Sequence, residues 1–279
     1  MGLTRRAFGV GSALAAATSG IGTASARGRG RFPWPDGKRA AVSLAYDDGL
    51  DSQLENVIPE LDAFGLKATF FLTKENMETR LADWVAVAGK GHEIGDHTVH
   101  HPCRLKSYSA DSFAAEEIAP MERFLDENFG ARRPRTYAYP CGFTGLGRGD
   151  VGERWRRYRS VVAPTFLAAR TVDGDPNDPR KALTNRYLLN AFEPTYDHDD
   201  PRFAGAYVRK AMARGGWAIL NFHEVLEARK GEGDTSKDVH HIILAWLVSQ
   251  PVWCAPIGEV FDYVAALDPD RLRSNRPKP

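Results

Sequence analysis

The sequence predicts a single α/β domain built on parallel β-strands that are joined by crossover helices. Short apolar runs alternate with amphipathic segments from about residue 40 to residue 266, a rhythm typical of parallel sheets. Neither an internal repeat nor an internal linker interrupts it, so one domain over residues 38–267 accounts for the pattern. Apolar residues make up 43% and charged residues 26% of the 279 residues, which excludes collagen-like, mucin-like and wholly disordered chains.

Hydrophobic periodicity assigns most of the elements. In residues 54–64 the apolar side chains follow the i, i+3, i+4 spacing of a core-facing helix, which Gly65 ends. The other expected helices are 76–88, 109–129, 204–214, one from Thr235 and 258–266. The expected strands are 40–46, 67–73, 93–97, 136–140, 217–222 and 252–256. Residues 142–201 are rich in Gly, Asp, Arg and Pro and show only two extended-looking segments, 160–163 and 187–192.

The two ends of the chain differ in composition from the domain. Residues 1–26 begin with the pair Arg5-Arg6, continue through an Ala/Gly-rich stretch and end Ala24-Ser25-Ala26, as a twin-arginine export signal does. We therefore expect export by the twin-arginine machinery to a periplasmic or extracellular location, followed by a leader at 27–37. Because such cargo folds in a reducing cytoplasm, we expect the three cysteines to stay unpaired. Residues 268–279 are charged and Pro-ended, and we expect a flexible tail there.

Charge and hydropathy exclude two classes of partner. Lys and Arg number 37 against 36 Asp and Glu, so the chain lacks the basic footprint of a nucleic-acid-binding protein. No apolar run reaches the roughly 18 residues that span a bilayer, so we expect no transmembrane segment after signal removal. The oligomeric state stays open.

Polar residues gather where the expected strands end. The first strand is followed by Asp47-Asp48-Gly49, the third by a segment with three histidines within five residues (97–101), and the strand near residue 220 by His223. The carboxyl ends of parallel strands meet at one edge of a sheet, and that edge carries the active sites of such folds. The sequence therefore predicts a site at this edge.

The residues at this edge suit a metal ion. His97 and His101 are four residues apart, so on one helical turn both imidazoles face the same way. A carboxylate from Asp47 or Asp48 would complete a set of two histidines and one carboxylate. Such a set fits zinc-dependent hydrolysis, and it also fits a non-haem iron oxygenase.

The motifs resemble those of the polysaccharide deacetylases with a NodB homology domain, carbohydrate esterase family 4. The family's Thr-Phe-Asp-Asp-Gly stands here as residues 45–49, Ala-Tyr-Asp-Asp-Gly, and its His-Ser/Thr-x-x-His-Pro is complete at residues 97–102. Its Leu-x-x-His stands at residues 220–223. The resemblance covers about residues 40–266 and implies a distorted (β/α) barrel of about seven parallel strands with outer helices.

The resemblance also implies roles for individual residues. It makes Asp48, His97 and His101 the ligands of a divalent metal, zinc first, with Co²⁺, Ni²⁺ or Mn²⁺ as alternatives. Asp47 is then the general base that takes a proton from the attacking water, and His223 is the general acid for the leaving group. The backbone N–H of Cys141 is the expected donor to the tetrahedral oxyanion. The substrate is an acetylated glycan, with either an N-acetylglucosamine-type amide or an O-acetyl ester as in xylan.

The chain departs from the family pattern in two places. The family's Arg-x-Pro-Tyr-Gly reads Ala138-Tyr-Pro-Cys-Gly142, so the arginine that orients the base is missing. We expect Arg170 to replace it. The family's aspartate-tryptophan pair is not visible, and Asp173 is a weak substitute for that aspartate. The candidate substrate contacts are Tyr139, Phe143 and Leu220, with Trp253 a further candidate aromatic.

Two other classes of function have to be considered. A catalytically silent glycan-binding module would keep the barrel but lack the base or a ligand, and all of the expected residues are present. An iron oxygenase would share the ligand set, but such sites commonly sit on a double-stranded β-helix, which the alternation of strand and helix disfavours. We therefore expect a metal-dependent polysaccharide deacetylase.

Overall fold

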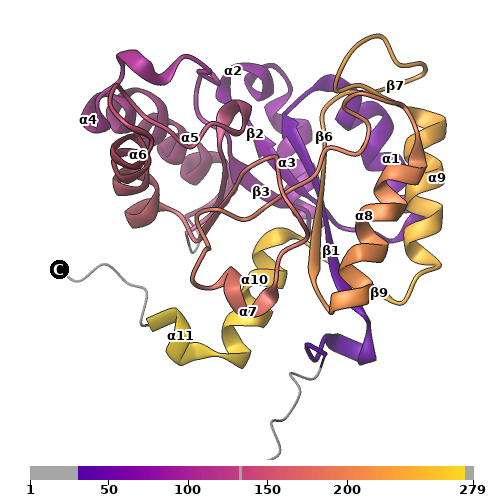
Figure 1. Cartoon of the computed structure of the whole chain (residues 1–279). Helices are drawn as coiled ribbons and strands as arrows, with labels where there is room; N and C mark the ends of the chain where they lie inside the picture. The colour runs from indigo at the N-terminus through magenta and orange to yellow at the C-terminus, as the bar shows by residue number, and fades with distance from the viewer. Residues whose placement is uncertain (1–30, 132–133, 274–279) are drawn as a thin grey trace, which may run out of the picture. The chain divides into compact units, whose positions relative to one another are not determined.

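Seven parallel strands form the central sheet of the computed structural model, which describes residues 31–131 and 134–273 (Figure 1). The strand order is β5-β4-β3-β2-β1-β6, and β9 pairs with the start of β1. Because β6 occupies one edge of β1, β9 fills the other edge before β2 begins there. The strands are β1 Ala40–Asp48, β2 Thr69–Leu72, β3 Glu93–Asp96, β4 Thr136–Ala138, β5 Ala168–Arg170, β6 Trp217–Phe222 and β9 Val252–Cys254. A separate pair comprises β7 Val225–Leu226 and β8 Thr235–Ser236.

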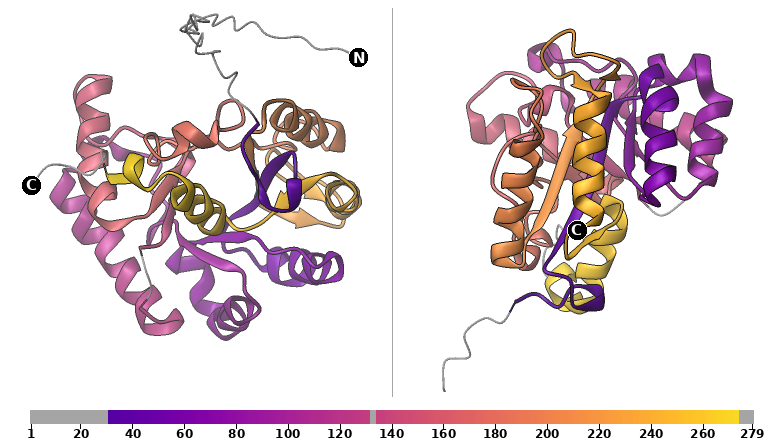
Figure 2. Two further views of the ribbon diagram at one scale, coloured as in Figure 1. Left: turned by 90° about the horizontal axis from the view of Figure 1, so that it is seen from below. Right: turned by 90° about the vertical axis from the view of Figure 1, so that its right-hand side faces the viewer.

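Helices connect the strands and lie around the outside of the curled sheet (Figure 2). The α-helices are α1 Ile58–Phe64, α2 Lys74–Met77, α3 Leu81–Gly89, α4 Ala110–Phe113, α5 Ala119–Phe129, α6 Val151–Thr165, α7 Pro179–Ala182, α8 Pro201–Arg214, α9 Lys237–Val248, α10 Ile257–Leu267 and α11 Pro269–Arg273. Short 3₁₀ or π turns are η1 Pro35–Gly37, η2 Gln53–Val57, η3 Glu78–Arg80, η4 Leu105–Ser107, η5 Ala114–Ile118 and η6 Pro140–Gly142. None of the described helices is both long enough and apolar enough to cross a bilayer.

The predicted distorted (β/α) barrel of about seven parallel strands is confirmed, and side-chain alternation separates its inner core from the side chains that pack under the outer helices. Successive residues of a strand point to opposite faces. In β1, Ala41 and Ala45 point into the barrel, whereas Val42 and Leu44 pack against the outer helices. Helix α10 shares the inner core and lies across the amino-terminal end of the strands (Figure 2). The remaining polar side chains of the barrel interior therefore lie at the carboxyl-terminal ends of the strands.

Residues 187–192, predicted to be extended, link the two edge strands of the sheet. Leu189 pairs with Arg170 of β5, and Phe192 pairs with Leu220 of β6. This segment bridges β5 and β6, which lie at opposite ends of the strand order. It therefore holds the sheet in its curled form.

Several sequence predictions were wrong in detail. Residues 160–163 belong to α6 and are not extended. The edge strand β5 was not predicted. The helix predicted to start at Thr235 begins instead at Lys237, and its N-cap is Ser236, whose side chain accepts from Val239 N–H. Part of the predicted flexible tail, residues 269–273, is the helix α11.

The predictions for the N-terminus concern residues that lie largely outside the described part of the chain. The predicted signal peptide, 1–26, lies entirely outside them, as does the start of the leader. The described part of the leader packs on the domain, since Phe32 and Trp34 are buried and Trp34 Nε1 donates to the Gly215 carbonyl at 3.1 Å. The folded domain therefore begins before residue 38.

Gly95 in β3 offers a test of the inner packing. A Cβ at this position would lie 2.5 Å from Cδ1 of Phe71, a fully buried ring of β2. Because the ring cannot move into solvent, we predict that Gly95→Ala lowers the free energy of unfolding by about 1–3 kcal/mol in urea denaturation. Gly89→Ala is the matched control, because a Cβ at Gly89 meets nothing within 4 Å. It should leave stability unchanged or raise it by up to about 1 kcal/mol, and equal losses in the two variants would contradict the packing described.

Candidate active site

The second of the two aspartates at the end of β1 departs from the regular strand conformation. Alternation along β1 places Asp47 inside the barrel, where its side chain is buried. Asp48 has φ +76°, which only a few per cent of non-glycine residues adopt, and this turns it out of the regular strand. Thr73 Oγ1 and Asn76 Nδ2 each donate to the Asp48 carbonyl at 3.0 Å and hold this conformation. As a result both carboxylates reach His97.

Asp47 forms a buried ion pair with Arg170, the residue that we expected to replace the missing arginine. Arg170 Nη2 donates to Asp47 Oδ1, and both side chains are nearly inaccessible. The same Nη2 donates to Asn221 Oδ1 at 2.9 Å, and Asn221 Nδ2 donates to Asp47 Oδ2 at 3.1 Å. The guanidinium also stacks 4.7 Å above the centroid of the Phe71 ring. Three strands thus hold one carboxylate in place.

The ion pair decides the charge of Asp47. Burial alone would raise the pKa of this carboxyl, but the charge of Arg170, helped by His97 and His223, holds that pKa well below its usual range. Burial lowers the pKa of His97 to about 4 against the opposing effect of Asp47 and Asp48. At neutral pH Asp47 is therefore ionised and His97 is neutral, the form of imidazole that binds metals.

Asp48, His97 and His101 fit a metal ion. Asp48 Oδ1 lies 3.6 Å from His97 Nε2 and 3.7 Å from His101 Nε2, and all three atoms lie within 4.8 Å of one another. Donors bound to one tetrahedral ion at roughly 2.0–2.2 Å are separated by about 3.3–3.6 Å, close to the spacing found here. His97 Nδ1 is 2.9 Å from the Ala138 carbonyl, a contact that fixes the ring with Nε2 toward Asp48.

Asp47 is as close to His97 as Asp48 is, at 3.7 Å, but its surroundings differ. Both oxygens of Asp47 already accept hydrogen bonds, from Arg170 and Asn221. Among the described residues, the carboxylate of Asp48 contacts only the two histidines. The geometry therefore favours Asp48 as the ligand, the assignment that the sequence spacing left open.

Unusual backbone conformations gather at this site. Of the five described non-glycine residues with positive φ, four lie here: Asp48, Thr98, His101 and Cys141. The loop of His101 is held by its own polar groups, since His101 N–H donates to Thr98 Oγ1 at 3.0 Å and Thr98 N–H donates to Asp96 at 2.7 Å. Residues in such conformations cost free energy and cluster at functional sites.

His223 faces the buried base from the end of β6. Its Nε2 lies 3.9 Å from Asp47 Oδ2 and 3.7 Å from Glu193 Oε1. Glu193 also accepts from Asn221 Nδ2 at 3.1 Å, and burial raises the pKa of its carboxyl, although His223 opposes this. Gln53 Nε2 donates to the carbonyls of both Asp47 and His223 and so ties the two strand ends together.

Sequence reasoning missed Glu193, Asn221 and Gln53. Asn221 could have been found from the alternation of side chains along β6. It lies two residues after the inward-pointing Ile219 and two before His223, so it shares their face. Glu193 follows the linking segment 187–192, whose position depends on closure of the sheet. Asp173, the predicted substitute for the family's aspartate, is exposed and its backbone carbonyl accepts from Thr171.

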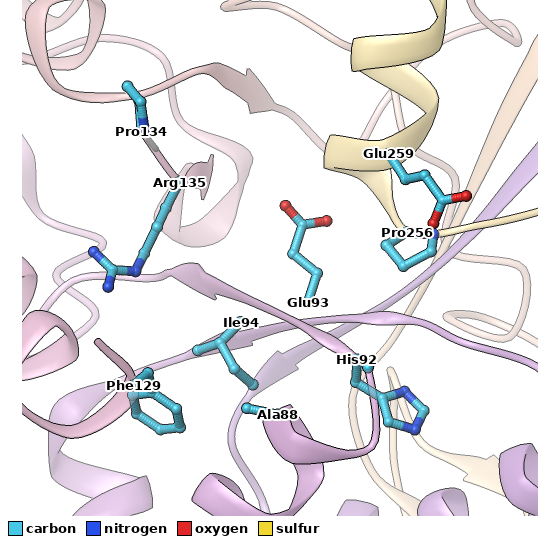
Figure 3. A pocket seen from close by; sticks show the side chains of 10 residues that line it. Ala88, His92, Glu93, Ile94, Phe129, Pro134, Arg135, Pro256 and Glu259 are labelled. Carbon is cyan, nitrogen blue, oxygen red and sulfur yellow. The ribbon is translucent and has the colours of Figure 1, made fainter. Parts of the chain in front are cut away.

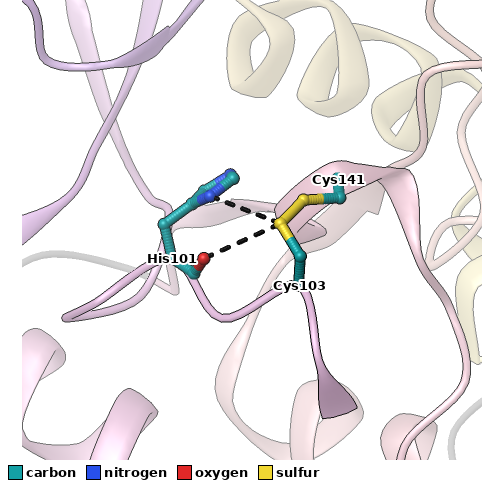
Figure 4. A group of neighbouring side chains, drawn as sticks. All are labelled: His101, Cys103 and Cys141. Atoms are coloured by element: carbon teal, nitrogen blue, oxygen red, sulfur yellow. Dashed lines mark hydrogen bonds between the residues drawn. A yellow bond between two sulfur atoms is a disulfide. The ribbon is translucent and has the colours of Figure 1, made fainter.

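The expectation of three unpaired cysteines was wrong. Cys103 and Cys141 form a disulfide with a Cα–Cα distance of 5.7 Å, and only Cys254 is free (Figure 4). The bridge joins the loop after His101 to the turn after β4. Cys103 Sγ lies 3.8 Å from His101 Nδ1, which leaves Nε2 for the metal group (Figure 4). In the disulfide form, the alternative cluster of His101, Cys103 and Cys141 has no thiolate to offer.

Two of the predicted substrate contacts were wrong because they lie on the outer face of the sheet. Tyr139 is fully buried against Tyr137 and Tyr158, and its hydroxyl donates to the Tyr187 carbonyl. Leu220 is fully buried in the outer core. Trp253 packs against Trp34 and Tyr263 at the amino-terminal end of the strands. Phe143 is different, since 52% of its surface is exposed.

A separate cavity of about 200 Å³ lies at the opposite edge of the sheet (Figure 3). It is lined by residues that precede or begin strands, among them His92, Glu93 and Arg135. The carboxylate of Glu93 accepts from Thr69, Thr136 and the Gly258 N–H, so it anchors α10 to the sheet. This cavity shares no residue with the site described above.

Comparisons with known proteins show a similarity to one family over part of the chain. Residues 35–146 match the sequence model of the family described as "Polysaccharide deacetylase". Over 93 residues the chain is 40% identical to the peptidoglycan-N-acetylglucosamine deacetylase of Bacillus cereus, and 33% of each protein is covered. Over 259 residues it is 26% identical to a gellan lyase of a Bacillus species, covering 82% of this chain and 10% of that one. Over residues 35–146, which include the end of β1 and the histidine loop after β3, the chain is thus similar to polysaccharide deacetylases.

Solved structures support the fold. The family 4 acetyl xylan esterase of Clostridium thermocellum, solved in complex with cobalt, superposes with a TM-score of 0.56 at 20% identity, covering 80% of this chain and 91% of that one. The family match to residues 35–146 includes Asp47, Asp48, His97, His101 and Cys141. Arg170, Glu193 and His223 lie beyond it. The chain spans no more than a third of the length of the two curated relatives named above.

Substitution of Arg170 measures how much the buried ion pair with Asp47 contributes to stability. We predict that Arg170→Met destabilises the fold by about 3–5 kcal/mol at pH 7, because the variant leaves the Asp47 charge buried without its partner. Without the guanidinium, burial raises the pKa of Asp47 above its unfolded value, so protonation then favours the folded variant. The stability gap to the wild type should therefore narrow as the pH falls from 7 to 4 in urea denaturation.

The double variant Arg170→Met/Asp47→Asn is the control, because it removes both charges. It should recover part of the loss, whereas strictly additive effects of the two substitutions would contradict a direct interaction.

Proposed function

We propose that the chain is a metal-dependent hydrolase that removes acetyl groups from an acetylated glycan. The observation that supports this best is the difference between the surroundings of Asp47 and Asp48. One is paired with Arg170 and shielded from solvent, and the other faces two histidines at metal-ligand spacing. The match of residues 35–146 to the polysaccharide deacetylase model and the similarity to the peptidoglycan-N-acetylglucosamine deacetylase of Bacillus cereus support the same reaction class.

Asp48, His97 and His101 would hold the divalent ion, for which we propose Zn²⁺. A bound Zn²⁺ at this place supplies Lewis acidity to a water molecule and to the acetyl carbonyl. Imidazole nitrogen and carboxylate oxygen are ordinary zinc ligands, and three protein ligands leave a coordination position for water or substrate.

The remaining residues would handle protons and charge. Asp47, ionised at neutral pH, accepts a proton from the attacking water, and Arg170 holds this carboxylate in place and ionised. His223 donates a proton to the leaving nitrogen or oxygen, and Glu193 lies beside it. The backbone N–H of Cys141 donates to the developing oxyanion.

The other two classes of function gain no support from the geometry. A silent binding module needs no ionised carboxylate shielded by a buried arginine. An iron oxygenase needs the ligands but neither the base nor a histidine facing it. We further propose that the chain is exported, a proposal that rests on residues 1–26. The disulfide agrees with an oxidising destination, where it would form after the folded chain has left the cytoplasm.

Acetate release tests the proposed function. The zinc-loaded chain should release acetate from at least one glycan in a panel of chitin oligosaccharides, peptidoglycan and acetylated xylan, and a chelator should abolish the release. Asp47→Asn keeps a polar side chain of similar size without the basic oxygen, so turnover should fall by roughly 10²–10⁴ while zinc stays bound.

Two results would count against this assignment. Zinc lost from Asp47→Asn would mean that the aspartates have exchanged roles. No acetate from any glycan in the panel, with zinc bound at full occupancy, would favour the silent module.

The metal site has a matched pair of histidines for a second test. His101→Ala should reduce zinc content from about one ion per chain to a small fraction, as measured by elemental analysis after dialysis. His100→Ala is the control, because His100 is exposed and its Nδ1 lies 3.1 Å from Glu117. Zinc should be retained in His100→Ala, and full occupancy in His101→Ala would exclude the proposed ligand set.

A further inference from the structure

A basic groove runs beside the candidate active site. Two contiguous cavities with volumes of about 540 and 580 Å³ share Lys106, Arg148 and Arg154. Both volumes lie within the range of roughly 300–1,000 Å³ usual for ligand sites. The 540 Å³ cavity is also lined by Arg104 and by the exposed ring of Phe143.

The positive charge of this groove is not neutralised. Four of its lining residues are cationic and none is acidic, although the whole chain has a net charge of only +1. Within the described part of the chain, none of these four cations forms an ion pair. Arg154 Nη2 donates to the Gly145 carbonyl at 3.2 Å, and its Nε is buried without a partner. The nearby Asp150 and Glu153 cap the start of α6 and line neither cavity.

The groove is joined directly to the site. Cys103 lines the 540 Å³ cavity, and its disulfide to Cys141 connects that wall to the candidate oxyanion turn. Cys103 Sγ also contacts His101, a candidate metal ligand (Figure 4). On the other wall, Gly147 N–H donates to the Leu105 carbonyl at 2.9 Å and holds the two loops together. A glycan with one sugar at the metal group would extend along this groove.

We propose that the groove binds anionic groups, carboxylate or phosphate, on sugars that neighbour the acetylated one, so that the substrate is an acidic polysaccharide. This inference rests on the proposed function. Arginine donates paired hydrogen bonds to carboxylate and phosphate, and Phe143 offers an apolar face to a sugar ring. A neutral glycan would leave four cations of the groove without partners.

Binding of unacetylated probes tests the groove separately from the chemistry. The probes are an oligogalacturonate, a phosphate-substituted oligosaccharide, a neutral xylo-oligosaccharide of equal length and a single-stranded oligonucleotide of equal charge. The zinc-loaded chain should bind one of the two acidic glycans at least about tenfold more tightly than the neutral glycan, and this difference should shrink with added salt. The better of the two acidic probes identifies the anionic group.

Charge removal provides the decisive comparison. Arg104→Gln/Arg148→Gln should weaken binding of that acidic glycan about tenfold or more, whereas Arg39→Gln, which removes an exposed charge at the opposite edge of the sheet, should leave it within about twofold. Thermal denaturation checks the folding of each variant, and Arg148→Gln alone replaces the double variant if that one unfolds. Equal binding by the groove variant and the Arg39 control, or tighter binding of the oligonucleotide than of both acidic glycans, would overturn the proposal. If the groove binds acidic glycans but no acetate is released from any glycan, the result supports the proposed groove and contradicts the proposed deacetylase function.

Discussion

The buried contact between Asp47 and Arg170 depends on the curvature of the whole sheet. In the strand order, β1 and β5 are four positions apart, which in a flat sheet is roughly 19 Å. Only a sheet curled into a half-barrel brings the end of β5 across to the end of β1. The segment 187–192 secures this curvature, since it pairs with β5 at Leu189 and with β6 at Phe192. The same segment delivers Glu193 to the site, so sheet closure and site assembly are one event.

This constraint also separates the two aspartates. A regular strand would point adjacent side chains to opposite faces, and one carboxylate would then be lost to the outer core. The positive φ of Asp48 ends the strand one residue after Asp47 and brings both groups to the same edge. Arg170 and Asn221 engage the first carboxylate, whereas the second is left for His97 and His101. Neighbouring residues of the same type thereby acquire different chemistry from their surroundings.

The sequence predicted the parallel sheet and most of its elements because hydrophobic periodicity is a local property. The metal-ligand group was also within reach, since its members follow β1 and β3 of one parallel sheet, and parallel strands end at the same edge. Arg170 came from a different argument, namely that a base without its usual cation needs another one. The structure supplies that contact, although the arginine stands on a strand that the Gly- and Pro-rich composition of 142–201 had concealed.

Other features required three-dimensional information. Tyr139 and Leu220 lie next to site residues in sequence but on the outer face of their strands, so proximity in sequence was misleading. The disulfide of Cys103 and Cys141 joins two loops whose meeting depends on β3 pairing with β4. Glu193 follows the segment that links the two edge strands, and Gln53 contacts two strand ends that are far apart in the sequence, so neither residue carries a local motif. Contacts between segments that are far apart in the sequence are thus the part of the fold that is hardest to predict from a single sequence.

The position of a bound zinc ion tests the central claim most directly. Crystals of the zinc-loaded protein, measured at the zinc absorption edge, should show one anomalous peak at roughly 2.0–2.2 Å from Asp48 Oδ1, His97 Nε2 and His101 Nε2. Asp47 should remain paired with Arg170 and outside bonding distance of the ion. A peak bonded to Asp47, with the Arg170 guanidinium turned away from that carboxylate, would contradict the account.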